Sequence, residues 1–311
     1  MPFISDPELD ALLDQLPALA GQPRQLEELH GGLTNRNIKI TTPAATYVAR
    51  CSVNATTMLG IDRDNEYYNS KAAEQAGVGA PVIDYRPDLG ILLVGFLEGT
   101  TLTNADLQCP DVLARVAEGC RTLHAGPRFR DRFNMFELQP AYLKVVQERG
   151  FRIPTDYLYF TREFQAVKRI LGPDEHATVP CNNDLLAGNF VDNGSKVWLI
   201  DYEYSGNNDP LFRARQHLAE CGLSTDQLDE LVSLYYGRRL RHKTARARLQ
   251  GIIGKYGWTL WGCIQKTAPA HWISTSGNGR WNATSPPSPS FVAPPSFRAC
   301  SLTPRHLTDD R

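Results

Sequence analysis

The apolar pattern of this chain changes near residue 98, and that change limits the folds the chain can adopt. Residues 25–52 predict strand, turn, strand, turn, strand, since short alternating runs are separated by Gly- and Pro-containing turns. Residues 65–77 have helical spacing and end at Gly77, and residues 78–99 add two strands around a turn at 87–90. Five strands and one long helix within about a hundred residues predict a mostly antiparallel sheet with the helix packed on it.

Beyond residue 99 the apolar residues recur at three- and four-residue spacing, which is typical of helices. This pattern covers residues 109–126, 140–150, 158–172 and 209–266, and a further helix is expected at 6–16. A strand pair interrupts it, with strands in 188–194 and 196–206 joined by a turn at 192–194. The sequence therefore predicts an α+β fold with two lobes. Residues 1–97 form an N-terminal antiparallel sheet with one long helix, and residues 98–266 form a mainly helical C-terminal lobe.

Residues 267–311 differ from both lobes. They contain neither Glu nor Lys, are rich in Pro and Ser, and show no periodicity. Such a composition cannot bury enough apolar surface to order a segment, so a disordered tail is expected.

Charge and cysteine content exclude several classes of protein. The formal net charge is −1, and the basic run at 238–248 carries no aromatic residues, so we expect a solvated helix face and no nucleic-acid partner. The seven scattered cysteines form no CxxC pair, which favours reduced thiols and a cytoplasmic location. No apolar stretch is long enough to span a bilayer, so no membrane insertion is expected. The sequence carries no signal of oligomeric state.

The most informative motif is CNNDLLAGNF at 181–190, followed by LIDYEY at 199–204. Phosphoryl transfer needs one carboxylate to orient the attacking hydroxyl and accept its proton, and carboxamide and carboxylate oxygens to hold Mg²⁺ against the nucleotide phosphates. Asp184 and Asn189 enter a strand, and Asp201 ends its partner strand, so one hairpin brings the three groups to one edge. Asp184 is the candidate base, and Asn189 and Asp201 are the candidate Mg²⁺ ligands. Taken singly, the residues are better explained without catalysis, Asp184 and Asn189 by turn chemistry and Asp201 as the end of a strand. The catalytic interpretation rests on their joint order.

Several motifs together resemble the choline/ethanolamine kinases, relatives of the aminoglycoside phosphotransferases with a protein-kinase-like fold. The resemblance covers about residues 26–266 and rests on GGLTNRN (31–37), YVAR (47–50), IDRDNEYYNS (61–70), the two motifs above and WTLWGCIQ (258–265). It implies ATP and Mg²⁺ as cofactors, a nucleotide-binding lobe at 1–97, and a catalytic and substrate lobe at 98–266. It also implies a role in supplying phospholipid precursors.

The resemblance assigns nucleotide contacts to the first lobe. A strand–turn–strand would cover the phosphates with backbone N–H groups and with Gly32, Thr34 and Asn35. Arg50 would contact phosphate and pair with Glu66 of the following helix, although both also fit the description of surface charges. Adenine would pack against residues 94–97.

Substrate selection is assigned to aromatic and acidic residues. Choline is a permanent cation without a donor on nitrogen, so its site needs aromatic faces and negative charge. The resemblance places Trp258, Trp261 and Tyr204 in an aromatic wall and gives Glu220 the negative charge, whereas spacing alone fits core packing of the two tryptophans. Choline and ethanolamine both remain candidate acceptors.

The chain departs from the family pattern at three places. Asn182 stands where the family has His, Arg213 stands where an Asp braces the catalytic loop, and the Pro/Ser-rich tail replaces the helical C-terminus. Misplacement of reacting groups by about an ångström lowers rates on the order of a hundredfold, so reduced activity is expected. Two other functions stay open: a phosphotransferase for an aminoglycoside or another amino-bearing hydroxyl compound, and a degraded, non-catalytic kinase-like module.

Overall fold

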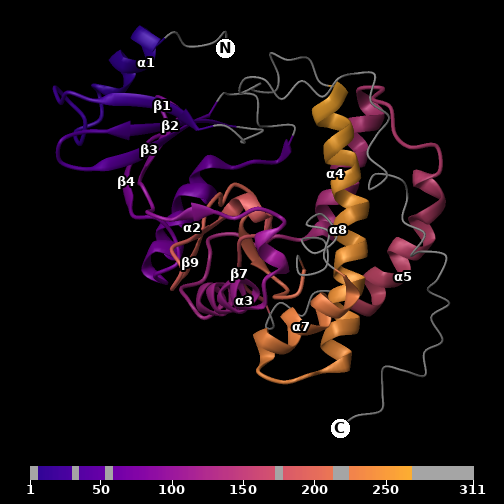
Figure 1. The fold of residues 1–311 in the computed structure, drawn as a ribbon. Coiled ribbons are helices and arrows are strands. Elements are labelled where there is room, and N and C mark those ends of the chain that lie inside the picture. Colours follow the sequence, from indigo (N-terminus) through magenta and orange to yellow (C-terminus); the bar gives the residue numbers. More distant parts are fainter. Residues whose placement is uncertain (1–5, 30–34, 53–58, 172–177, 213–223, 268–311) are drawn as a thin grey trace.

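The structure is a computed structural model that describes residues 6–29, 35–52, 59–171, 178–212 and 224–267. It has two lobes, with a sheet and the helices α1 (Asp6–Leu13) and α2 (Arg63–Gln75) on one side and a larger, mainly helical body on the other (Figure 1). The predicted α+β, protein-kinase-like fold is confirmed. The lobe boundary after residue 97 stays a prediction.

The first lobe is built on a five-stranded antiparallel sheet of order β1-β2-β3-β5-β4. Its strands are β1 (Gln25–Leu29), β2 (Asn35–Thr41), β3 (Thr46–Ser52), β4 (Val82–Arg86) and β5 (Ile91–Gly95). One face is apolar, since Ile38, Ile40 and Leu93 are buried there beneath Leu9 and Leu13 of helix α1 (Asp6–Leu13). All five strands lie where the alternation predicted them, and α1 is shorter than the predicted 6–16.

Helix α2 (Arg63–Gln75) follows the first three strands and contacts β4. Its first turn is capped by the Asp62 carboxylate, which accepts from the Asn65 amide at 3.1 Å. Gly77 ends it with φ of +80°, a conformation that only Gly adopts without strain. The buried side of α2 includes four polar residues, Asn65, Glu66, Asn69 and Ser70. This helix therefore presents a polar face to the second lobe.

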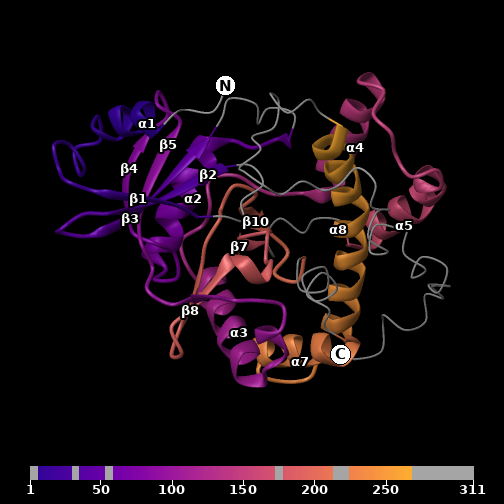
Figure 2. The same cartoon turned by 45° about the horizontal axis from the view of Figure 1, so that its top comes forward.

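The second lobe is mainly helical. Its helices are α3 (Pro110–His124), α4 (Met135–Glu148), α5 (Thr161–Leu171), α7 (Thr225–Tyr236) and α8 (Arg241–Thr267), with short 3₁₀ turns η2 (Asp106–Gln108), η3 (Tyr157–Phe160) and η5 (Ala187–Asn189). The long helices α4 and α8 lie side by side (Figures 1 and 2). Helix α4 begins five residues before its predicted start, because the Asn134 side chain caps it at Phe136, and Pro140 is accommodated inside it.

Five very short strands lie near the centre of the molecule. They are β6 (Thr100–Thr101), β7 (Val179–Cys181), β8 (Phe190–Asp192), β9 (Val197–Leu199) and β10 (Gly206–Asn208). The predicted hairpin is confirmed as β8–β9, but its strands have three residues each and the chain leaves the ladder before Asp201. The pairing of β7 with β10 was not predicted.

The described part of the chain bears on two further expectations. The basic run is mostly exposed, as expected for a solvated face: Arg239 and Arg248 make exposed ion pairs with Asp229, and the less exposed Arg246 pairs with Asp209. None of the described helices is both long and apolar enough to cross a membrane. The predicted disordered tail lies outside the described residues.

Candidate active site

The loop between β7 and β8 holds Asp184 and Asn189 together. Turn η5 brings the Asn189 side chain back toward Asp184, and its Nδ2 donates to the Asp184 carbonyl at 2.7 Å and to Asp184 Oδ2 at 3.1 Å. Both residues are partly exposed at the start of the hairpin. The structure thus gathers the predicted base and one predicted metal ligand.

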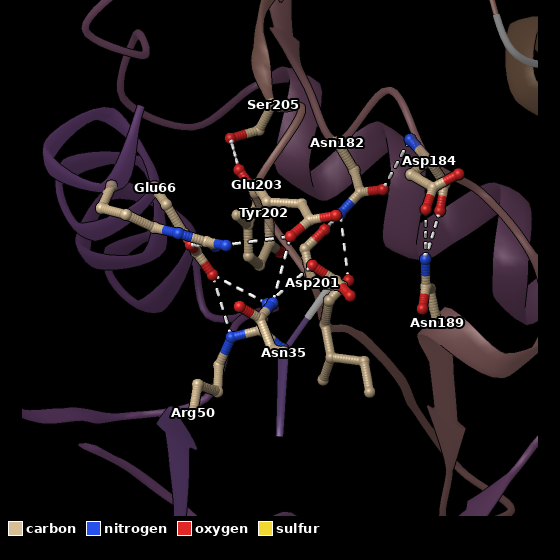
Figure 3. A network of polar contacts seen from close by, with 12 residues as sticks. Asn35, Arg50, Glu66, Asn182, Asp184, Asn189, Asp201, Tyr202, Glu203 and Ser205 are labelled. Atoms are coloured by element: carbon tan, nitrogen blue, oxygen red, sulfur yellow. Dashed lines mark hydrogen bonds and ion pairs between the residues drawn. The ribbon is translucent and has the colours of Figure 1, made fainter. Parts of the chain in front are cut away.

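Asp201 lies next to this pair, just beyond β9. The Ile200 amide donates to the Asn189 carbonyl at 3.0 Å, which holds the two segments side by side. Asp201 has φ of +64°, an uncommon conformation for a residue with a side chain. Its Oδ1 accepts from Arg50 Nη2 at 2.8 Å. In the view of Figure 3, Asp201 lies between the Asp184–Asn189 pair and the charged residues of the first lobe.

A network of five charged side chains joins the lobes (Figure 3). Arg50 of β3 donates through Nε to Glu66 Oε1 at 2.9 Å and through Nη2 to Asp201. Arg63 of α2 donates to Glu66 Oε2 and, at 3.3 Å, to Glu203 Oε2. Glu66 is only 3% exposed, so it is not one of the surface charges that the sequence also allowed.

The network shifts the pKa values of its two buried glutamates in opposite directions. Burial acts to raise the pKa of Glu66, but the guanidinium groups of Arg50 and Arg63 outweigh it and hold that pKa below its usual value. Burial and the carboxylates of Asp201 and Glu66 raise the pKa of Glu203 to about 8, against the pull of the two arginines. The network therefore favours the ionised form of Glu66 and the protonated form of Glu203.

Glu203 and Arg63 are the residues of this network that sequence reasoning missed. Both lie inside quoted motifs, but among the five network residues only Arg50, Glu66 and Asp201 received roles. Glu203 is two residues after Asp201, so in an extended segment both side chains point to the same side. This two-residue spacing is the sequence signal that could have identified Glu203.

Asn35 is the predicted phosphate-loop residue that the structure describes. It begins β2, is 2% exposed, and its Nδ2 donates to Glu203 Oε2 at 3.1 Å. The contact ties the end of the predicted nucleotide loop to the segment after Asp201. Gly32 and Thr34 lie outside the described residues.

The predicted aromatic wall is assembled on α8. Trp261 Nε1 donates to the Tyr204 hydroxyl at 2.6 Å, and the ring of Tyr204 makes an edge contact with Trp258 at 4.9 Å between centroids. The two indoles contact each other edge to face at 6.1 Å. Both tryptophans are half-buried, and they also pack against the apolar cluster around α4 and α8, so core packing and an open aromatic face coexist. Glu220 and Arg213 lie outside the described residues.

The polar face of α2 binds the segment that follows Glu203. Asn65 and Asn69 both donate to the Ser205 carbonyl, at 3.1 and 3.2 Å, and Asn69 donates to Ser205 Oγ at 2.9 Å. Asn69 is fully buried, and its Oδ1 accepts from the Arg130 amide. These contacts fix α2, and with it Glu66, relative to the hairpin.

The donor chemistry at the hairpin fits magnesium. Carboxylate and carboxamide oxygens from Asp184, Asn189, Asp201 and Glu203 lie on adjoining segments, and hard oxygen ligands are what Mg²⁺ requires. Among the described residues no group of three or more His, Cys, Asp or Glu side chains is placed to hold a metal ion by itself. Mg²⁺ is usually bound by one or two carboxylates together with substrate phosphates, so this arrangement suits a nucleotide-borne ion.

His124, the last residue of α3, is partly buried and lies behind the catalytic loop. Its Nδ1 lies 2.8 Å from the Tyr235 hydroxyl and its Nε2 lies 3.6 Å from Cys181 Sγ. Burial lowers its pKa to about 4, against the pull of Asp209.

This shift predicts acid sensitivity. Between pH 6.5 and 4 the unfolded chain binds a proton at His124 that the folded chain does not, so stability falls as pH falls through that window, by about 3 kcal/mol at most. The melting temperature of His124→Gln should therefore drop less from pH 7 to pH 5 than that of the wild type. His242→Gln, at an exposed histidine, is the matched control and should follow the wild type. Parallel curves for His124→Gln and the wild type would contradict the prediction.

Comparison with known proteins places the whole arrangement in one family. The family model for choline/ethanolamine kinases matches residues 26–232. Protein LicA of Haemophilus influenzae is 28% identical over 247 residues, which covers 74% of this chain and 70% of LicA. A choline/ethanolamine kinase family protein from Mesorhizobium loti superposes with a TM-score of 0.73 and 31% identity, covering 85% of this chain and 87% of that one. The choline kinase LicA from Streptococcus pneumoniae gives 0.70 and 22%, covering 83% and 90%, and supports the fold.

The family match spans well over half of the chain, from β1 through α7, and it includes both the charged network and the hairpin. This chain is therefore a member of the choline/ethanolamine kinase family, an enzyme that transfers a phosphoryl group to an alcohol acceptor.

Proposed function

We propose that this enzyme uses ATP to phosphorylate the hydroxyl of a small amino alcohol, choline or ethanolamine. The observation that carries the proposal is the contact between Asp184 and Asn189 beside an Asp201 that Arg50 links to Glu66. This is the set of groups that phosphoryl transfer from a nucleotide needs: a base, two metal-ligating oxygens and a cation held by a glutamate. The proposal includes action in the cytoplasm, on the route to phospholipid precursors.

Asp184 is the proposed base. Its carboxylate is oriented by Asn189 Nδ2 and would accept the proton of the substrate hydroxyl as the oxygen attacks the terminal phosphate. In a loose transition state the base mainly orients the nucleophile, so the fixed geometry of this carboxylate matters more than a shifted pKa.

Asn35, Arg50 and Glu66 are the proposed nucleotide contacts of the first lobe, together with Gly32 and Thr34. Arg50 is fixed by Glu66 on one side and Asp201 on the other, so its guanidinium has a defined position beside the hairpin. A planar guanidinium binds phosphate oxygens in two parallel contacts, which suits this role. Residues 94–97, which include the end of β5, are the proposed surface for adenine.

Asn189 and Asp201 are the proposed Mg²⁺ ligands. Bound there, the ion would neutralise the charge on the nucleotide phosphates. The Asp201 carboxylate would hold the ion, and Glu66 would still hold Arg50 beside the hairpin for contact with phosphate. The fold of this chain keeps the Asp201 carboxylate, the Asn189 carboxamide and the Arg50 guanidinium close together.

The half-buried Trp258 and Trp261, with the buried Tyr204 packed against them, are the proposed binding site of the ammonium group. Glu220 is its proposed charge partner. A quaternary ammonium gains from aromatic faces, whereas a primary ammonium gains from hydrogen bonds to carboxylates. The described wall offers mainly aromatic surface, which supports choline as an acceptor alongside ethanolamine.

The proposed function is tested by Mg²⁺-dependent ADP release from ATP with choline, ethanolamine and an aminoglycoside as acceptors. Turnover with either amino alcohol is expected, with little or none on the aminoglycoside. Preference for the aminoglycoside would favour the related phosphotransferases instead. Thermal stabilisation by MgATP without turnover on any acceptor would identify a non-catalytic module, since a ligand that binds the native state raises its stability.

The aromatic wall makes a separate prediction about acceptor choice. Trp261→Leu removes an aromatic face and the donor to Tyr204, so KM for choline should rise about tenfold, the equivalent of one cation–π contact. KM for ethanolamine should rise less. Trp198→Leu is the control, since Trp198 on β9 packs with Lys196 away from the wall. Equal rises for both alcohols, measured by steady-state kinetics, would contradict an aromatic seat for the ammonium group.

A further inference from the structure

Asn182, the residue that departs from the family pattern beside Asp184, contacts both halves of the hairpin. It is 1% exposed. Its Nδ2 donates to the Ile200 carbonyl at 3.1 Å and to the Asp201 carbonyl at 2.8 Å. Its Oδ1 accepts from the Asp184 amide at 2.9 Å. One buried carboxamide therefore spans from the proposed base to the proposed metal ligand (Figure 3).

The backbone on both sides of this bridge is strained. Asn183 has φ of +62° and Asp201 has φ of +64°, and they are the two non-glycine residues with positive φ in the described part of the chain. Such conformations persist only where surrounding contacts over-determine them, and they gather at functional sites. The Asn182 side chain bonds to the residue after Asn183 and to Asp201 itself, so it helps to hold both conformations.

The carboxamide suits these three partners by its chemistry. It offers two N–H donors and one acceptor oxygen on a single plane, and here two carbonyls and one amide use all of them. An Asp carboxylate of the same shape would still accept from the Asp184 amide. Its second oxygen would face the carbonyl oxygens of Ile200 and Asp201, and neither side could donate a hydrogen bond. A neutral imidazole offers one donor and one acceptor, and so satisfies only part of the set.

The neighbouring asparagines do not duplicate this bridge. Asn183 donates to the Tyr204 carbonyl at 3.0 Å and accepts from Asn208, and neither contact reaches Asp184 or Asp201. Asn183 therefore stabilises the local turn, whereas Asn182 links the two sides of the hairpin.

We propose that Asn182 is a positioning residue that sets the Asp184 carboxylate relative to Asp201. The inference rests on the proposed function, and it reverses the expectation that Asn at this position weakens the site. Asn182 acts through the backbone of its two neighbours and touches neither substrate nor nucleotide. Its removal should lower kcat and leave the KM for the alcohol nearly unchanged, because the aromatic wall does not depend on it.

Asn182→Asp is the decisive variant, because it changes one side-chain nitrogen to oxygen. It keeps the acceptor for the Asp184 amide and removes both donors to the β9 side. We expect kcat to fall about a hundredfold, the cost of a misplacement of about an ångström, with KM for the alcohol within about threefold of wild type. Asn182→His keeps one donor and one acceptor and should recover part of the loss relative to Asn182→Ala.

Asn193→Asp is the matched control, since Asn193 is an exposed turn residue of the same hairpin that uses its Oδ1 as an acceptor. It should keep wild-type kcat. Amide hydrogen exchange in the protein without nucleotide or metal gives a readout independent of turnover. The Asp184 amide should exchange faster in Asn182→Ala and stay protected in Asn182→Asp.

The outcomes separate the inference from the function on which it rests. A wild type without turnover on either amino alcohol removes the proposed function, whatever the variants do. A wild type that turns over, with Asn182→Asp at wild-type kcat and melting temperature, overturns the positioning role alone. An activity loss in Asn182→Asp that matches its loss of folded protein also overturns it. If Asn182→Ala does not fold, the kcat values of Asn182→Asp and Asn182→His test the positioning role.

Discussion

Replacing Asp184 by Asn is expected to lower kcat about a thousandfold, within the range that a positioned general base contributes. The substitution keeps the shape of the side chain and removes its ability to accept the proton of the substrate hydroxyl. MgATP binding should persist, because Arg50, Asn189 and Asp201 do not need a negative charge at Asp184 to hold their places. Steady-state kinetics with either amino alcohol, together with thermal stabilisation by MgATP, measures the two effects separately.

Asp192→Asn is the control for this prediction. Asp192 lies on the same hairpin, 8% exposed, and accepts from Arg115 at 3.1 Å. Losing that carboxylate should cost some stability and leave kcat within a few-fold of wild type. If Asp184→Asn kept more than a tenth of wild-type kcat, Asp184 would not be the base, and the roles of the hairpin carboxylates would have to be reassigned.

The elements that could be predicted from the sequence are those with local signals. Alternating residues and Gly- or Pro-containing turns placed the strands of the first sheet, and spacing of three and four placed the helices. The turn at 192–194 identified the hairpin, because the Asp192 and Asn193 side chains bond their own turn backbone. The order of Asp184, Asn189 and Asp201 along this hairpin was enough to bring the candidate site to one place.

The remaining features had no local signal. Strands β7 and β10 have three residues each, and the pairing of Gly206 with Cys181 depends on backbone packing so close that a side-chain carbon at Gly206 would lie 2.9 Å from the Phe133 nitrogen. The contacts of Asn65 and Asn69 with Ser205 join residues more than a hundred positions apart.

The burial of charged residues could not be predicted from the sequence either. Hydrophobic periodicity predicts which apolar residues are inside, but it treats a charged residue in a polar helix such as α2 as exposed. Glu66 and Glu203 are buried beside arginines: Arg63 pairs with both glutamates, and Arg50 pairs with Glu66. These pairs exist only after β3, α2 and the hairpin have come together. The site was therefore predictable as a set of reacting groups, and much less so as the network that holds them.

Replacing Arg50 by Met is expected to be the most destabilising single change in this network, at about 3 kcal/mol or roughly 6–10 °C in melting temperature. The side chain is 12% exposed and neutralises Glu66 and Asp201 at once, so its removal leaves buried carboxylates with only Arg63 to balance them. Binding of MgATP should weaken as well, because the proposed phosphate contact is lost. Arg50→Lys keeps the charge but not two fixed contacts, and should be intermediate.

The loss of stability in Arg50→Met should also depend on pH, because burial already favours the protonated form of Glu203. Arg50 lowers the pKa values of Glu66 and Glu203, so both should rise without the guanidinium. The folded variant then binds more protons than the wild type does, and its stability declines more steeply as pH increases. The difference in melting temperature between wild type and Arg50→Met should therefore be larger at pH 9 than at pH 6. Arg36→Gln is the matched control: Arg36 pairs with Glu28 at 3.1 Å on the same sheet, but at a more exposed site, where a pair contributes at most about 1 kcal/mol. If Arg50→Met cost no more than Arg36→Gln at either pH, the carboxylates would not need this cation, and the network would not be what joins the hairpin to the first lobe.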